Sequence, residues 1–107
     1  MAEFIDLEEK NKLCVNMATN LPVLRAKAGL SQDDLADRLG FSRQTISAIE
    51  NGKRSMQWST FTAIALFLSK DEEIKELMIV MGILNNALDE MLSVESKKLQ
   101  SKTDTED

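Results

Sequence analysis

Two short helical segments on either side of Gly40 constrain the fold more than any other part of the sequence. Residues 31–39, SQDDLADRL, and residues 42–50, SRQTISAIE, are each only about two helical turns long. Segments of this length bury too little surface to be stable alone, so they must pack on each other and on further helices. Ala36 is small enough to let a crossing helix approach, and Gly40 can adopt the left-handed conformation of a tight turn. The pattern predicts a crossed pair of short helices inside a larger helical domain.

The rest of the chain predicts an all-α fold of about five helices with N- and C-terminal helical extensions. Among its 107 residues, four are Gly and one is Pro, so few residues interrupt helices. Apolar spacing predicts a first helix from residue 6, which either kinks or restarts near Asn20 because Pro22 lacks a backbone N–H. A strongly apolar helix is expected over 56–68, and Ser69 is a candidate N-cap of the next one.

The residue types exclude several kinds of chemistry. The chain contains no His, which excludes mixed Cys/His zinc sites and Ser-His or Cys-His nucleophilic pairs. The single Cys14 lies in an apolar helical context and is expected in the core. We therefore expect no metal, no cofactor and no enzymatic activity. We also expect a cytoplasmic protein, since there is neither a basic, apolar signal sequence nor a membrane span.

The net charge of −5 argues against a nucleic-acid partner, but its distribution does not. Residues 20–70 carry seven basic residues against four acidic ones, whereas residues 1–19 and 71–107 both have an acidic excess. The middle of the chain is therefore mildly basic, and the acidity belongs to its two ends.

The second short segment has more hydrogen-bonding side chains than a helix of its length needs. Ile46 and Ile49 are expected to pack back onto Leu35 and Ala36. That packing leaves the start and outer face of the segment to Arg43, Gln44, Thr45, Ser47 and Ala48.

Residues 20–68 resemble the helix-turn-helix domain of the lambda repressor/Cro-like, or Xre, family of bacterial and phage transcriptional regulators. The residues that carry the resemblance are Gln32, Ala36, Gly40, Ile46, Ile49 and the run Glu50-Asn51-Gly52-Lys53-Arg54.

The resemblance implies a set of contacts with double-stranded DNA, because in this family the second helix enters the major groove. Transferred to this chain, the residues facing base edges are Arg43, Gln44, Thr45, Ser47 and Ala48. The residues implied to contact phosphates are Gln32, Ser42, Asn51, Lys53 and Arg54, with long-range attraction added by Arg25 and Lys27. Glu50, which is acidic, is expected to form a structural pair with a nearby Arg.

The C-terminal region carries a longer apolar stripe than a small bundle needs. It continues through Leu84, Leu88, Met91 and Leu92. We therefore divide the chain into an N-terminal helical extension (1–19), a DNA-binding domain (20–81), an amphipathic dimerisation helix (82–99) and a disordered acidic tail (100–107). The expected assembly is a homodimer, acting as a repressor on a palindromic operator.

An alternative function leaves the fold unchanged. As an antitoxin, the chain would bind a toxin protein, and its DNA binding would serve autoregulation. Co-purification with a small basic protein would favour this alternative.

Overall fold

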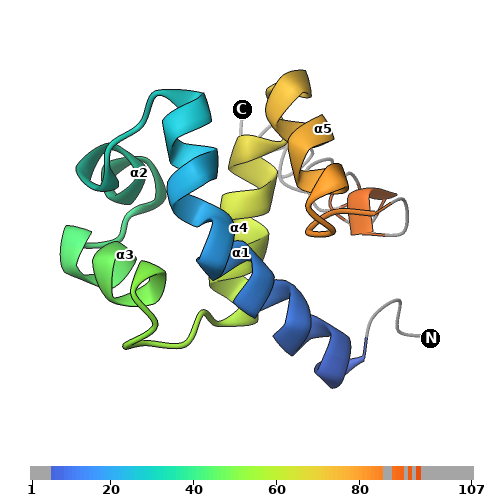
Figure 1. Cartoon of the computed structure of the whole chain (residues 1–107), viewed down its shortest axis with the longest axis horizontal. Helices are drawn as coiled ribbons and strands as arrows, with labels where there is room; N and C mark the ends of the chain where they lie inside the picture. Colours follow the sequence, from blue (N-terminus) through green and yellow to red (C-terminus); the bar gives the residue numbers. More distant parts are fainter. Residues whose placement is uncertain (1–5, 86–87, 91, 93, 95–107) are drawn as a thin grey trace, which may run out of the picture.

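The computed structural model describes residues 6–85, 88–90, 92 and 94, and within these residues it contains helices and no strands. The prediction of an all-α fold is therefore confirmed. Figure 1 labels five helices. They are α1 (Leu7–Ala28), α2 (Gln32–Leu39), α3 (Arg43–Glu50), α4 (Trp58–Leu68) and α5 (Glu72–Val80).

Helix α1 is continuous over 22 residues, although Pro22 lies inside it. Of the two outcomes predicted near Asn20, a kink or a restart, the restart is therefore wrong, and the boundary drawn between residues 19 and 20 falls within one helix. Proline removes a single backbone donor, and its own side chain is exposed here. Leu21 and Leu24, on either side, are fully buried. Their packing outweighs the lost hydrogen bond and keeps the helix intact.

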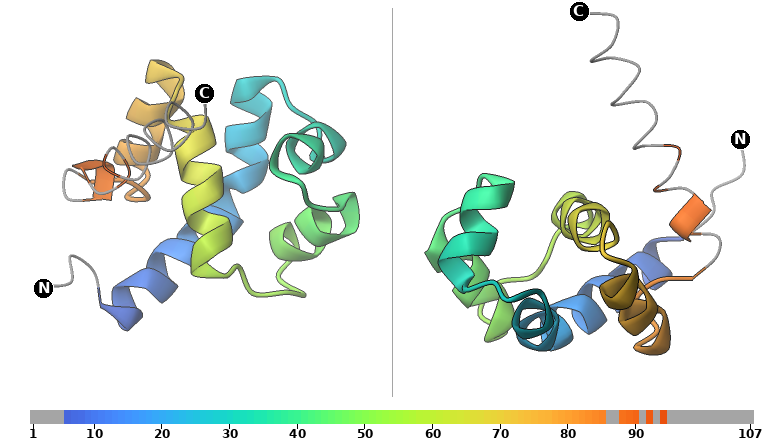
Figure 2. Two further views of the ribbon diagram at one scale, coloured as in Figure 1. Left: turned by 180° about the vertical axis from the view of Figure 1, so that it is seen from behind. Right: turned by 90° about the horizontal axis from the view of Figure 1, so that it is seen from above.

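Helices α1 and α4 pack together at the centre of the molecule, with the other helices on two sides. The α2–α3 pair lies on one side and α5 on the other, as both Figure 1 and the view from above in Figure 2 show. The core between them includes the fully buried Met17, Phe61 and Ile64. Trp58 stacks on Phe61 with ring centroids 4.8 Å apart, so both aromatic residues have a structural role.

Helix α5 begins two residues later than the candidate cap suggested. Asp71, rather than Ser69, is its N-cap, and the Asp71 carboxylate accepts from the backbone N–H groups of Glu73 and Ile74. Ser69 instead ends α4, and its hydroxyl donates to the carbonyl of Leu66. Both residues are good caps, and of the three residues between the helices the first ends α4 and the third begins α5.

The C-terminal apolar stripe is buried within the chain itself. Leu84, Leu88 and Leu92 are at most 2% exposed and belong to the same core as Met17. In a single copy of the chain they are therefore covered rather than exposed, and their assignment as dimerisation residues stays a prediction. Met91 and residues 95–107 lie outside the described residues.

A hydrogen bond and an ion pair hold this region to the bundle. The side-chain amide of Asn16 in α1 donates to the carbonyl of Met81 over 2.9 Å, next to the turn at Gly82. Lys75 in α5 lies 3.1 Å from Asp89. The apolar residues that suggested a partner instead pack in the chain's own core, next to α1 and α5.

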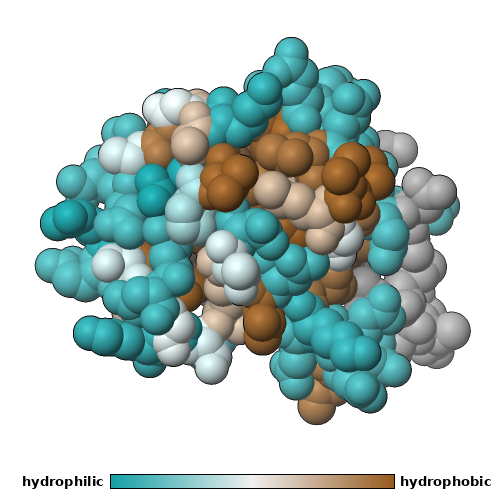
Figure 3. Space-filling view, in the orientation of Figure 1, coloured by the Kyte–Doolittle hydropathy of each residue, from teal (hydrophilic) through white to brown (hydrophobic). Residues whose placement is uncertain are grey.

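The exposed apolar residues gather elsewhere. Figure 3 shows hydrophobic surface over α5 and the adjoining part of α1. The exposed apolar residues of these two helices include Val23 of α1 and Ile79 and Val80 of α5. None of the described helices combines the length and apolar character needed to cross a membrane.

Candidate nucleic-acid interface

Helix α2 has well-defined ends that lead directly into α3. The Ser31 hydroxyl accepts from the N–H of Asp34, and the Asp34 carboxylate accepts from the N–H of Ser31, which forms a capping box. The hydrogen bond from the Ser31 backbone N–H to the carboxylate is the largest cause of the lowered pKa of Asp34. At the other end, Gly40 has φ 77°, and the N–H of Phe41 donates to the Ala36 carbonyl over 2.9 Å. The left-handed turn expected at Gly40 is therefore confirmed.

The inner face of α3 packs as the sequence predicted. Ile46 and Ile49 are at most 3% exposed, and α3 lies against both α2 and α1. Leu35 and Ala36 of α2 are buried in the same core, so a small side chain does occur where the two helices approach. This packing turns the opposite face of α3 outward.

The outer face of α3 carries a shallow hollow of about 250 Å³. It is lined by Arg43, Gln44, Ser47, Ala48 and Asn51. Four of these are among the five residues predicted to face bases, and the fifth, Asn51, was predicted to contact phosphate. The structure thus brings four of the five predicted base-facing residues onto one surface.

Thr45 and Ser42 differ from the other predicted contact residues because they bond to each other. The Ser42 hydroxyl accepts from the Thr45 N–H over 3.1 Å, and the two side-chain hydroxyls lie 2.9 Å apart. Ser42 is thus the N-cap of α3. Both side chains have a structural hydrogen bond that any DNA contact would have to share or replace.

The turn after α3 places two cations beside the hollow. The backbone N–H groups of Lys53 and Arg54 both donate to the Ala48 carbonyl, over 2.9 and 3.1 Å. The Asn51 carboxamide oxygen accepts from the Lys53 N–H, which leaves its NH₂ group as the part suited to a phosphate oxygen. Lys53 and Arg54 are exposed. The hydrogen bonds fix the backbone of this turn, and the charged side chains extend from it.

A buried ion pair connects α3 to α1 and α2. The Arg25 guanidinium donates to both carboxylate oxygens of Glu50, over 2.6 and 2.9 Å, and also to the Leu30 carbonyl. The side chains are 16% and 7% exposed. The Gln32 side-chain amide donates to the same carboxylate over 3.0 Å. The hydrogen bonds to Glu50 raise the pKa of Arg25. The structural role expected for Glu50 is therefore confirmed.

The network changes the roles of three residues predicted from the sequence. Arg25 is neutralised by Glu50 and is not a free cation near DNA. Lys27 lies 3.4 Å from Glu73, so its charge is also partly balanced. The Gln32 NH₂ group bonds to Glu50, a contact that sequence reasoning missed. The sequence contains one signal for this contact, because Glu50 is the only acidic residue between Asp37 and Asp71.

The outer surface of α3 is suited to a polyanion. Helix α3 has no acidic residue in its first turn, so its positive end is not screened there. Glu50, at the other end of α3, directs its carboxylate into the network with Arg25. The side chains that remain on the outer surface include cationic and amide groups, which bind phosphates and base edges.

Helices α2 and α3 are short and capped, and they cross through a left-handed glycine turn. The polar face of α3 is turned outward. This arrangement defines a helix-turn-helix. A family model described as a helix-turn-helix domain matches residues 17–75. The chain belongs to this family.

Two curated relatives agree with the assignment. An uncharacterized HTH-type transcriptional regulator of Methanocaldococcus jannaschii is 46% identical over 59 residues, which cover 54% of this chain and 89% of that protein. A second, of Methanothermobacter thermautotrophicus, is 38% identical over 64 residues, which cover 60% of this chain and 91% of the relative. Both relatives are archaeal, whereas the predicted resemblance was to bacterial and phage regulators. No solved structure matches the chain.

Proposed function

We propose that this chain is a lambda repressor/Cro-like, or Xre-family, regulator that binds double-stranded DNA in a sequence-specific manner and represses transcription by occupying its operator. The observation that carries the proposal is the hollow on the outer face of α3, lined by Arg43, Gln44, Ser47, Ala48 and Asn51. The names of the two relatives, both HTH-type transcriptional regulators, support it.

The side chains of the hollow suit the edges of base pairs in the major groove. An Arg can donate two hydrogen bonds to guanine O6 and N7, and a Gln can pair in the same way with adenine N6 and N7. Arg43 and Gln44 are both exposed at the first turn of α3, where this fold presents side chains to bases. Ser47 can bond to either kind of edge, and Ala48 can contact a thymine methyl group.

The turn after α3 supplies the proposed phosphate contacts. Lys53 and Arg54 carry the charge, and the Asn51 NH₂ group can donate a hydrogen bond. Gln32 can take part only if its amide keeps or exchanges its bond with Glu50. We therefore assign most of the phosphate affinity to Lys53 and Arg54.

Selection of bound sequences from a random pool of DNA duplexes tests this proposal. Enrichment of one motif, with binding that weakens as salt is raised, is the expected result. Equal recovery of all sequences by the full chain, or no binding at low salt, would contradict it.

We also propose that the chain binds DNA as a homodimer, on a palindromic site with half-sites about 10 base pairs apart. The surface that supports the proposal is on α5, where Ile79 is 47% and Val80 83% exposed. This surface lies on the other side of α1 and α4 from α3, so two copies joined through it would keep both α3 helices free (Figure 2).

The dimer proposal is tested by sedimentation equilibrium of the full chain and its Val80→Asp variant. We expect a dimer for the unmodified chain and a monomer for the variant, because a buried unpaired charge opposes association. Leu7→Asp is the matched control, since Leu7 is an exposed apolar residue at the start of α1, away from α5. A monomeric unmodified chain at micromolar concentration would contradict the proposal.

A further inference from the structure

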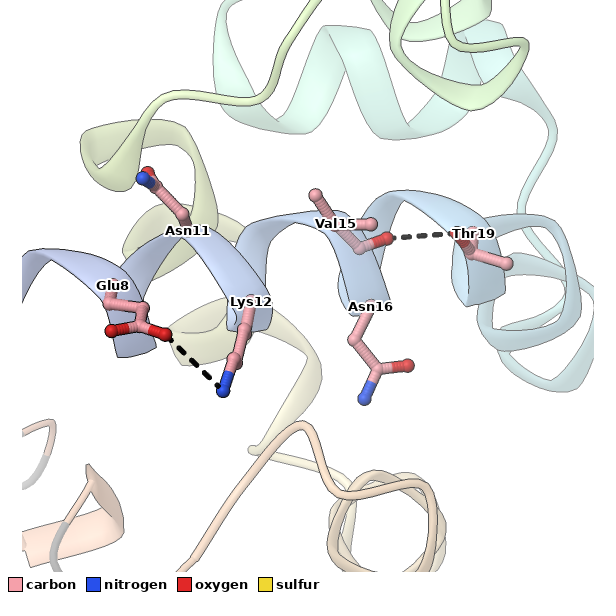
Figure 4. Close-up of a pocket in the computed structure, with 6 residues that line it drawn as sticks. All are labelled: Glu8, Asn11, Lys12, Val15, Asn16 and Thr19. Atoms are coloured by element: carbon pink, nitrogen blue, oxygen red, sulfur yellow. Dashed lines mark hydrogen bonds and ion pairs between the residues drawn. The ribbon is translucent and has the colours of Figure 1, made fainter.

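A second hollow, distinct from the one on α3, lies behind the end of that helix. Its volume is about 420 Å³, and it is formed between the first half of α1 and the residues that connect α3 to α4. Cavities of a few hundred Å³ are of the size that small ligands occupy. Figure 4 shows a neighbouring pocket on α1 that shares Asn11 and Val15 with this hollow, and there both side chains point away from the side that carries Lys12 and Asn16.

The lining of this hollow is apolar at its base. Cys14 of α1, Ile49 of α3 and Met56 of the connecting segment all line it, and each is at most 7% exposed. Burial raises the pKa of the Cys14 thiol, which keeps this residue neutral. Ala18, which also lines the hollow, has a side chain small enough to leave the space open. Such a surface suits the hydrocarbon part of a ligand.

One cation at the rim is not balanced by the acid beside it. Arg54 and Glu50 both line the hollow, but both carboxylate oxygens of Glu50 already accept hydrogen bonds from Arg25 or Gln32. Asn11 adds a neutral polar group. The apolar base and the exposed guanidinium together complement a molecule with a hydrocarbon body and one anionic group.

We propose that this hollow binds a small amphipathic carboxylate and that this ligand weakens DNA binding. The second part rests on the proposed function, in which Arg54 contacts a phosphate. A carboxylate that holds the Arg54 guanidinium competes with that phosphate for the same donors. The Arg54 backbone N–H is bonded to Ala48, so a ligand there also touches the segment that ends the DNA-contacting helix.

Binding is tested first without DNA, by NMR titration of the full chain with octanoate. We expect saturable shifts of the backbone amides of Asn11, Ala18 and Arg54. Acetate, which has no hydrocarbon body, and octanol, which has no charge, should bind at least about tenfold more weakly. Equal shifts with acetate, or an absence of saturation, would overturn the ligand site.

Two charge variants locate the carboxylate. Arg54→Gln should weaken octanoate binding about tenfold, whereas Lys53→Gln, which removes the neighbouring cation outside the hollow, should leave it unchanged. Both residues are exposed, so neither variant is expected to unfold the chain. An equal loss in the two variants would show general charge attraction and would overturn the assignment.

The regulatory part is tested with the duplex obtained by selection. Saturating octanoate should raise the dissociation constant for DNA about fivefold over the same concentration of acetate, which matches the ionic strength. Octanoate that binds without changing DNA affinity would overturn the regulation. Failure to bind any DNA would instead contradict the proposed function, and the titration without DNA would still decide the ligand site.

Discussion

Helix α3 and the segment from residue 83 to residue 92 have similar apolar spacing but are held in the fold in different ways. Helix α3 is attached through two isoleucines and a nearly buried ion pair, and its outer face remains exposed and polar. The later segment is attached through Ile83, Leu84, Leu88 and Leu92, all buried in the common core. The first leaves a surface free for a ligand, and the second closes the bundle.

The difference shows what apolar periodicity can and cannot predict. Spacing correctly indicated that Leu84, Leu88 and Leu92 occupy one buried face. It could not indicate whether a second copy or the same chain covers that face, because both give the same pattern. For α3 the family resemblance supplied the missing information, since it implied what lies on each side.

The ion pair beneath α3 gives the largest expected effect on stability. Glu50→Ala leaves Arg25 nearly buried without its partner and removes the acceptor of Gln32. Breaking such a pair costs about 3–5 kcal/mol. We expect this loss in the free energy of unfolding, measured by urea denaturation followed by circular dichroism.

The control for this variant is Glu76→Ala, which removes an exposed carboxylate from α5. It should change the free energy of unfolding by less than about 0.5 kcal/mol. If the two variants had equal stability, the ion pair would not hold α3 in place.

Leu88→Ala tests whether the C-terminal stripe belongs to the core. Removing a fully buried leucine leaves a cavity and costs about 2–5 kcal/mol. The loss should be independent of protein concentration, because the residue packs within its own chain. Leu7→Ala, which shortens an exposed leucine at the start of α1, is the matched control and should cost little. A loss that appears only at dimer-forming concentrations would restore the interface predicted from the sequence.

The cap of α2 should have a smaller effect. Ser31→Ala removes the hydroxyl that accepts from the Asp34 N–H, which costs about 1 kcal/mol. Ser31→Gly introduces a residue type that is favourable at N-caps, so it should lower the free energy of unfolding by only a few tenths of a kcal/mol. Chemical denaturation of the two variants measures the difference. Equal stability of Ser31→Ala and the unmodified chain would exclude the capping box as a contributor.

The smallest effect is a pH dependence that arises from Asp34. Its pKa is lowered in the folded chain from the ordinary value of 3.8, first by the hydrogen bond from the Ser31 backbone. The charged carboxylate therefore stabilises the fold above pH 3.8, and this contribution disappears as the pH falls through the folded pKa. The stability difference between the unmodified chain and Asp34→Asn should be constant near neutral pH and shrink in acid. A difference that grows in acid would contradict the assignment.

Much of the candidate site could be predicted from the sequence because it depends on local signals. Ser31 and Ser42 cap helices within three residues of themselves, and Gly40 ends a helix at its own position. Ile46 and Ile49 were placed correctly by spacing within one helix. Interactions of this range are visible in any window of about ten residues.

The contacts that sequence reasoning missed, or for which it did not identify the partner, join distant parts of the chain. Arg25 and Glu50 are 25 residues apart, and the hydrogen bond from Asn16 to Met81 spans 65 residues. No periodicity within a helix encodes such pairs. Whether α1 continues through Pro22 was left open, because the buried leucines that compensate for proline depend on tertiary packing.

The central claim is that the outer face of α3 recognises base edges while the turn after it binds phosphate. The most direct measurement compares the affinities of Arg43→Ala, Gln44→Ala and Lys53→Ala for the selected duplex and for a scrambled one. Arg43→Ala and Gln44→Ala should each lose about 1–3 kcal/mol of preference for the selected site. Lys53→Ala should weaken binding to both duplexes alike and reduce the salt dependence by about one charge. Unchanged preference in both α3 variants would contradict the account.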